Sequence, residues 1–126
     1  MARKSVLIIG EDPALVDFDA PDAPKDMSAA KVMDGLNSSV ARLQAAGHEA
    51  EVLLTRDAAS VEGQVGRALQ GRNHDVIVIG AGLRTLPKMA AQFELLINAL
   101  RDKSPQSKLA FNSRPDDSDV AALRWL

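Results

Sequence analysis

Ser5-Val-Leu-Ile-Ile-Gly10 and Asp75-Val-Ile-Val-Ile-Gly80 decide the fold of this chain. Both runs are continuously apolar and rich in β-branched residues, which is typical of strands covered on both faces in the middle of a parallel sheet. Residues 51–55 and 108–112 are less uniformly apolar, so we expect them to form edge strands.

Segments with helical periodicity separate these strands. The first helix is expected to start near Asp26 or Ser28, either of which can cap free N–H groups, and to end at Gly47. Its apolar stripe is Ala29, Met33, Leu36, Val40 and Leu43. The second helix is expected over about residues 57–70. Its inward positions are Ala58, Val61, Val65 and Ala68.

Two further helices follow the third and fourth strands. One is expected to begin near Pro87, since proline suits a first helical turn, and to stop before Pro105. Its apolar positions are Met89, Phe93, Leu96 and Leu100. A short last helix follows Asp117 or Ser118. It carries Val120, Leu123 and Leu126 as its apolar residues, and we expect Trp125 to cap the core.

The alternation of strands and helices predicts one α/β domain over residues 1–126. Every crossover contains a helix, so the four strands should be parallel with right-handed connections. Because the two most apolar strands belong in the middle, the expected order is 2-1-3-4. This is a three-layer flavodoxin-like (Rossmann-like) sandwich without a fifth strand.

Composition and charge exclude several classes of protein. The chain has 126 residues, no cysteine and 17 acidic against 15 basic side chains. No apolar run approaches the roughly 20 residues of a membrane helix, and Val6–Ile9 is too short for a signal sequence, so we expect a cytoplasmic protein with no membrane partner. Residues 11–26 hold six acids and one base. A nearly balanced chain with one acidic segment is not expected to bind nucleic acid.

The candidate site lies where the strand order reverses, between the first and third strands, because open parallel sheets bind ligands outside the carboxyl ends there. The loops at this edge are 11–26, 81–88 and 112–115. The candidate ligand-binding residues on them are Glu11, Asp12, Gly80, Gly82, Arg84, Thr85, Asn112 and Arg114. His48 and His74 precede strands and fall at the opposite edge, so no histidine base should reach Thr85 or Ser113.

The residues at this edge suit an anion, although each has a second interpretation. The turn Gly80-Ala-Gly-Leu-Arg-Thr85 could offer bare amides to a phosphate, or its glycines could only permit a tight turn. It lacks the third glycine of a dinucleotide fingerprint, and no cofactor is expected. Arg84 and Arg114 follow neighbouring strands and could hold a carboxylate or phosphate together, or could instead pair with Glu11 or Asp12.

The acidic loop 11–26 is interrupted by the apolar residues Leu15, Val16 and Phe18. A solvated connection would not need them, so we expect the loop to fold back as a lid over the arginines. A hard cation on the aspartates of this loop is an alternative, as is a solvated acidic connection, and no metal site is assigned.

Three segments and the chain end resemble a family of short bacterial α/β proteins. These are Gly10-Glu-Asp-Pro13, Gly80-Ala-Gly-Leu-Arg84, Phe111-Asn-Ser-Arg-Pro115 and the terminal Ala-Leu-Arg-Trp-Leu. The resemblance implies the α/β fold and a bacterial cytoplasmic setting, and it brings no catalytic residues. Glu11 and Asp12 are also similar to the acidic pair of response-regulator receiver domains. The receiver's phospho-accepting aspartate is replaced here by Gly80-Ala-Gly82.

Three functions follow from these observations. The first is a binding protein for an anionic small molecule, held at the candidate residues beneath the acidic loop. The second is an enzyme that uses Asp12 or Glu11 as a general base on such a substrate. The third is a degenerate receiver-like interaction module that acts by oligomerisation, for which a homodimer through the edge of the fourth strand is the simplest form.

Overall fold

The computed structural model describes residues 3–126 and contains one four-stranded sheet. Its strands are β1 (Ser5–Glu11), β2 (Glu49–Thr55), β3 (Val76–Ile79) and β4 (Lys108–Phe111). All three strand pairs are parallel, and the order is β2-β1-β3-β4. The predicted parallel sheet and its order 2-1-3-4 are therefore confirmed. Residues 1 and 2 of the expected domain lie outside the described residues.

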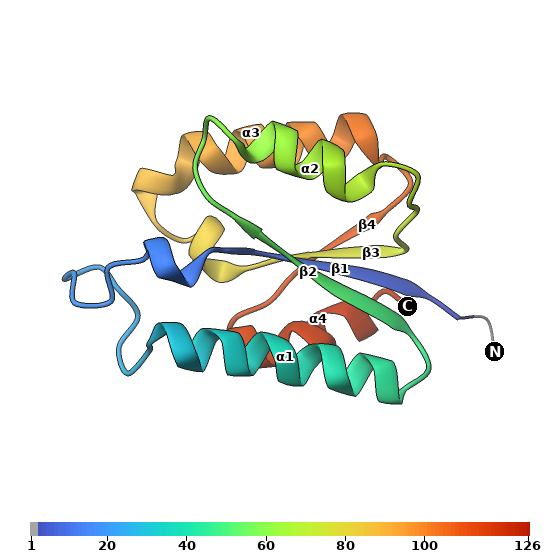
Figure 1. Ribbon diagram of the computed structural model, residues 1–126, viewed down its shortest axis with the longest axis horizontal. Helices are drawn as coiled ribbons and strands as arrows, with labels where there is room; N and C mark the ends of the chain where they lie inside the picture. Colours follow the sequence, from blue (N-terminus) through green and yellow to red (C-terminus); the bar gives the residue numbers. More distant parts are fainter. Residues whose placement is uncertain (1–2) are drawn as a thin grey trace.

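Helices cover both faces of the sheet and complete the three layers (Figure 1). The helices are α1 (Ala29–Ala45), α2 (Val61–Leu69), α3 (Ala90–Lys103) and α4 (Ser118–Leu123). Short 3-10 turns η1 (Pro13–Leu15), η2 (Ala81–Leu83), η3 (Pro87–Met89) and η4 (Pro115–Asp117) lie at the carboxyl-terminal edge. Helices α2 and α3 lie over one face, and α1 and α4 lie over the other.

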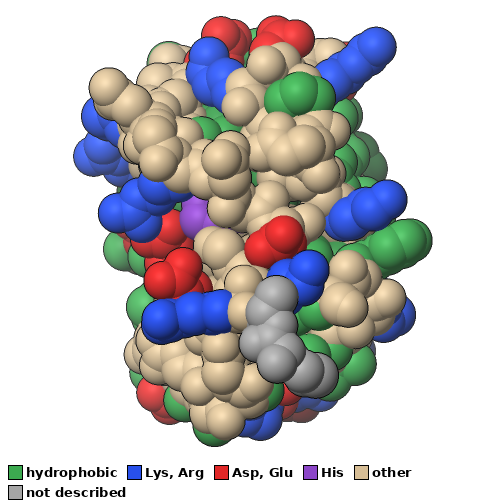
Figure 2. Space-filling view, turned by 90° about the vertical axis from the view of Figure 1, so that its right-hand side faces the viewer, with side chains coloured by type: hydrophobic (Ala, Val, Ile, Leu, Met, Phe, Trp, Pro, Cys, Tyr) green, Lys and Arg blue, Asp and Glu red, His purple; other side chains and the backbone are tan. Residues whose placement is uncertain are grey.

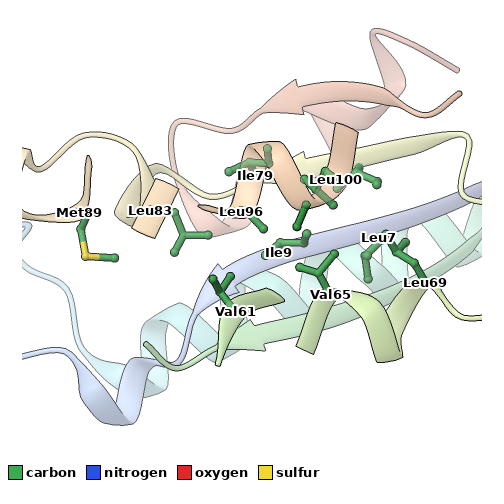
Figure 3. Close-up of a cluster of buried hydrophobic side chains, with 12 residues drawn as sticks. Leu7, Ile9, Val61, Val65, Leu69, Ile79, Leu83, Met89, Leu96 and Leu100 are labelled. Carbon is green, nitrogen blue, oxygen red and sulfur yellow. The ribbon is translucent and has the colours of Figure 1, made fainter. Parts of the chain in front are cut away.

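The central strands are buried throughout, as their composition predicts. Each residue of Val6–Ile9 and of Val76–Ile79 is at most 2% exposed. Side chains of alternating direction on these strands feed two separate cores, one on each face of the sheet. Figure 3 shows the first of them, in which Leu7 and Ile9 of β1 meet Val65 of α2 and Leu96 of α3.

Helix α1 has the capped start and the glycine end that its sequence indicates. Ser28 is the N-cap, and its Oγ accepts a hydrogen bond from the Lys31 amide at 3.2 Å. Gly47 follows the helix with φ +91°, a left-handed conformation that glycine adopts without strain. Leu36 and Leu43 are buried on the sheet side, whereas Ala29 at the first turn is exposed.

Helix α2 begins later than predicted. The segment from Asp57 to Ser60 is a turn, in which Oδ1 of Asp57 accepts hydrogen bonds from the amide and the hydroxyl of Ser60. These bonds compete with the helical hydrogen bonds, so the helix starts at Val61. Ala58, which was expected to face the core, is exposed.

The buried face of α4 also differs from the expected one. Val120 is 55% exposed and Leu123 is 50% exposed, whereas Ala121 and Ala122 are fully buried. Asp119 turns toward α1 and sets this orientation, because its carboxylate accepts a hydrogen bond from Nε of Arg42 at 2.9 Å. Of the three expected apolar contacts only Leu126 packs on the core.

The expectation that Trp125 caps the core is likewise wrong, since this residue is 53% exposed.

In residues 3–126 no helix has both the length and the apolar composition that crossing a membrane requires.

Candidate functional site

A cavity of about 560 Å³ lies at the carboxyl ends of β1, β3 and β4. Its floor comes from the strand ends at Gly10 and Gly80 and from the segment 112–115. Its size falls within the range of pockets that hold small metabolites. A Cβ on Gly80 would lie 3.2 Å from the carbonyl oxygen of Ile9, so glycine allows β3 to turn away tightly at this point.

Apolar side chains form much of the cavity wall. They come from the loop after β1, from the first turns of α1 and from the segment before η3. They are Pro13, Val16, Phe18, Pro24, Met27, Val32, Leu36 and Leu86. Met27, Val32 and Leu86 were not expected at this site, although Val32 and Leu36 share one face of α1 at a spacing of four residues.

The loop between η1 and α1 covers one side of the cavity, at the left in Figure 1. Val16 and Phe18 line the cavity, whereas Leu15 is 56% exposed and does not. An ion pair of 3.3 Å between Oδ2 of Asp22 and Nζ of Lys88 joins this loop to η3. The loop therefore folds back over the sheet edge, with two of its three apolar residues directed inward.

Glu11 is the last residue of β1 and lies in the cavity wall. Burial raises the pKa of its carboxyl group above the ordinary value, and the positive charge of Lys88 opposes this effect. Within residues 3–126 its carboxylate forms no ion pair. Glu11 is therefore a partly desolvated acid that faces the cavity and forms no ion pair with the described residues.

Asp12 is occupied by the local backbone. Its Oδ1 accepts a hydrogen bond from the Ala14 amide at 3.0 Å and caps η1, while its own amide donates to the carbonyl oxygen of Thr55. Asp12 does not line the cavity. The two adjacent acids thus have different roles, because only Glu11 presents its side chain to the cavity.

Arg84 braces the sheet edge and does not line the cavity. Its guanidinium donates hydrogen bonds to the carbonyl oxygens of Ile79 and Asn112 and lies 4.8 Å from the ring centroid of Phe111. Burial lowers the pKa of this guanidinium from its ordinary value, opposed by the charge of Asp117. The expected convergence of Arg84 and Arg114 on one ligand is absent from this structure, because Arg84 is held by the backbone.

Asn112 connects three segments at the floor of the cavity. It is 4% exposed; its Oδ1 accepts a hydrogen bond from the Ala81 amide and its Nδ2 donates to Oγ of Ser118, both at 2.9 Å. Thr85, which also lines the cavity, donates its hydroxyl to the carbonyl oxygen of Ala81 at 2.9 Å. Both side chains therefore stabilise the turn after β3.

The same turn leaves few amides for an anion. The amides of Leu83, Arg84 and Thr85 donate to carbonyl oxygens within the turn, and that of Ala81 donates to Asn112. No protein acceptor within residues 3–126 is found for the amide of Gly82. The glycines of this segment thus mainly permit a tight turn, with one amide left beside the cavity.

Two cationic side chains line the cavity, Lys25 from the covering loop and Arg114 from the segment after β4. The Arg114 side chain is 66% exposed, and its Nε lies 3.3 Å from Oδ1 of Asp116. Lys25 was not among the candidate residues, because it is the only base in an acidic loop and the fold alone does not direct it inward.

Metal-ligating groups do not gather in the described part of the chain: no cluster of three or more histidine or acidic side chains is arranged to hold an ion. His48 and His74 line a different cavity, at the amino-terminal edge of the sheet, as their positions before β2 and β3 predict.

No protein-family model matches this chain, and no curated protein does. Among solved structures, the chain is similar to a crystal structure described as "putative lipoprotein from Peptoclostridium difficile 630 (fragment)". The TM-score is 0.52 at 12% sequence identity, and the match covers 96% of this chain and 93% of the other. At this identity the likeness shows the fold alone. The resemblances to short bacterial proteins and to receiver domains stay predictions.

Proposed function

We propose that this protein binds a small molecule with an apolar body and a carboxylate or phosphate group in the cavity at the carboxyl-terminal edge. The observation that carries the proposal is the cavity of about 560 Å³, which combines an apolar wall with two cationic side chains at the point where strand order reverses. Lys25 and Arg114 would pair with the anionic group.

The loop over the cavity supports a binding role. Phe18 and Met27 contribute apolar contact area, and the Asp22–Lys88 ion pair is exposed enough to open and close at little cost. The loop supplies Asp22 and Asp26 to the lining as well, so the bound anion would compete with these carboxylates for Lys25 and Arg114.

A thermal-shift screen tests this proposal. The probes are medium-chain fatty acids, aromatic carboxylates, sugar phosphates and nucleotides, each applied to the wild type and to Arg114→Ala, Lys25→Ala and Arg101→Ala. Arg101 is exposed on α3 and is the matched control. We expect an amphipathic anion to raise the Tm of the wild type and of Arg101→Ala, and to raise it less in the other two variants. Equal shifts in all four proteins, or no shift with any probe, would contradict the proposal.

A second candidate function is an enzyme that uses Glu11 as a general acid or base. The specific observation is that this carboxyl group lies in the cavity, forms no ion pair within residues 3–126, and has a pKa that burial raises. Asp12, the other candidate base, is engaged in capping η1. If a ligand is found and is converted by the wild type, Glu11→Gln should bind that ligand with unchanged affinity but should no longer convert it. If Glu11→Gln still converts the ligand, Glu11 is not the general acid or base.

An interaction module that acts through a homodimer is the third candidate. The exposed Val120, Leu123 and Trp125 on and after α4 support it. Size-exclusion chromatography over a hundredfold range of protein concentration tests it, and a monomer throughout would contradict it. The cytoplasmic location expected from the sequence stays a prediction.

A further inference from the structure

A second cavity, of about 590 Å³, lies at the amino-terminal edge of the sheet, opposite to the proposed ligand site. Figure 2 shows this side of the molecule, with a histidine between acidic and basic side chains. Its lining includes Arg3, Ser5, Glu51, Arg72 and His74. These residues come from the starts of β1 and β2 and from the segment that precedes β3.

Three of these side chains form a chain of polar contacts. Oγ of Ser5 lies 3.0 Å from Nδ1 of His74, within hydrogen-bond distance. On the other side of the ring, Nε2 of His74 lies 3.4 Å from Oε1 of Glu51. A hydroxyl, an imidazole and a carboxylate that contact one another in this order form the arrangement by which a serine can be activated as a nucleophile.

The backbone holds Ser5 and His74 at a fixed separation although they are 69 positions apart in the chain. The Ser5 amide donates to Oδ2 of Asp75 at 2.9 Å, and the Asp75 amide donates to the carbonyl oxygen of Ser5 at 2.8 Å. The carbonyl oxygen of His74 accepts a hydrogen bond from Oγ of Ser107 at 2.6 Å. The hydroxyl and the imidazole are therefore preorganised.

The imidazole of His74 has the properties of a general base. Its side chain is 2% exposed, and burial lowers its pKa below the ordinary value, partly opposed by the charge of Glu51. The ring is therefore neutral at pH 7 and can accept a proton at Nδ1. Nε2 is buried without a hydrogen-bond partner within residues 3–126. The Glu51 carboxylate is positioned to pair with the imidazole once the imidazole is protonated. Nη1 of Arg72 lies 2.6 Å from this carboxylate and holds it in place.

We propose that Ser5, His74 and Glu51 form a second site, which cleaves small carboxylic esters through an acyl-serine intermediate. Oγ of Ser5 attacks the ester carbonyl carbon while its proton passes to Nδ1 of His74. The carbon–oxygen bond to the alcohol then breaks, and the alcohol leaves with that proton. Water repeats the sequence on the acyl-serine, releases the acid and restores the Ser5 hydroxyl.

The roles of the other charged groups follow from their positions. Glu51 is a positioning residue, since it acts on the substrate only through His74. Arg3 lines the same cavity and lies 3.7 Å from Glu49 at the exposed rim, from where its guanidinium can neutralise the oxyanion of the tetrahedral intermediate. None of these residues lines the cavity proposed above for the anionic ligand, so the two proposals stand or fall separately.

The proposal is tested by labelling the full chain with a fluorophosphonate probe. The Ser5 Oγ–phosphorus bond forms, fluoride leaves, and the hydroxyl proton passes through His74 to solvent. Intact mass and peptide mapping should show one label per chain, on Ser5. Ser5→Ala should take no label, whereas the exposed control Ser38→Ala should label as the wild type does. An unlabelled wild type, or a label on another residue, would overturn the proposal.

Two further variants separate catalysis from structural bracing. His74→Gln, with its fold checked by circular dichroism, should label about a hundredfold more slowly. Ser5→Ala keeps the imidazole of His74, so the proposal stays testable with that variant even if His74→Gln does not fold. Glu51→Gln should shift the pH midpoint of labelling to lower pH, because the ring loses the negative charge that favours its protonated form. An unchanged midpoint would remove Glu51 from the mechanism, and unchanged labelling of a folded His74→Gln would contradict the site.

Discussion

Nζ of Lys88 lies 3.3 Å from Oδ2 of Asp22, and this contact joins the loop after β1 to the segment after β3. Asp22 lines the proposed ligand cavity, and the side chains of Lys88 and Asp22 are 61% and 49% exposed. An exposed ion pair contributes at most about 1 kcal/mol to stability. A bound ligand can therefore change whether the loop is closed over the cavity.

We predict that Asp22→Asn loosens this loop without destabilising the fold. Because the lost contact is exposed, cleavage of residues 16–24 by a nonspecific protease should become faster by up to about fivefold, while the Tm changes little. An anion that binds beneath the loop should slow the cleavage in the wild type. If cleavage is the same with and without such a ligand, the loop is not a lid.

Arg84→Ala is predicted to destabilise the protein by about 1–3 kcal/mol, because two backbone carbonyl oxygens lose their guanidinium donor and Phe111 loses its cationic partner. Urea unfolding, compared with that of Arg101→Ala, measures the effect. The affinity for an anionic ligand should not change while the variant is folded. A variant that is stable but binds weakly would instead place Arg84 in the ligand site.

Two glycine substitutions within helices should act in opposite directions. A Cβ on Gly35 would lie 2.9 Å from the amide nitrogen of Asp116, so Gly35→Ala forces α1 and η4 apart and should destabilise by about 1–3 kcal/mol. On Gly63 a Cβ meets only the mobile end of Arg67 at 3.4 Å. Gly63→Ala should therefore stabilise by about 0.5–1 kcal/mol through helix propensity. Equal effects in urea unfolding would show that α1 and η4 are not in close contact.

The burial of His74 is expected to make the stability of the protein depend on pH. Because burial lowers its pKa in the folded protein, the unfolded chain takes up the proton first as the pH falls. The free energy of unfolding should then decrease from the ordinary histidine pKa of about 6.5 down to the lower folded value. In His74→Gln the profile should be flatter over this interval. If the free energy of unfolding has the same slope against pH in both proteins, the pH dependence comes from groups other than His74.

Trp125 is the only tryptophan, so its fluorescence reports directly on the exposed face of α4. In dilute solution its emission should resemble that of a solvated indole. If a homodimer covers this face, the emission should shift to shorter wavelength as the protein concentration rises, and Trp125→Ala should abolish the association. A short-wavelength emission that does not change with concentration would show that the indole is buried within the monomer.

The sheet could be predicted from the sequence because Val6–Ile9 and Val76–Ile79 are apolar at every position, which only a central strand can accommodate. Smaller features were predicted less well. The register of α4 depends on the contact of Asp119 with Arg42, 77 residues away in the chain. No local pattern of apolar residues contains that contact, and it turns Val120 and Leu123 outward.

The sequence by itself determined the parallel sheet, its strand order and the edge at which the polar loops gather, because hydrophobic burial follows from local composition and periodicity. Only the tertiary structure decided which polar side chains are available there. Arg84 and Asp12 are hydrogen-bonded to the backbone and do not line the cavity. Asn112 lies at the cavity floor but is hydrogen-bonded to the Ala81 amide, whereas Glu11 and Arg114 present charged groups to the cavity. Hydrogen-bond partners come from distant parts of the chain, and for that reason Ser5 meets His74 only in the folded protein.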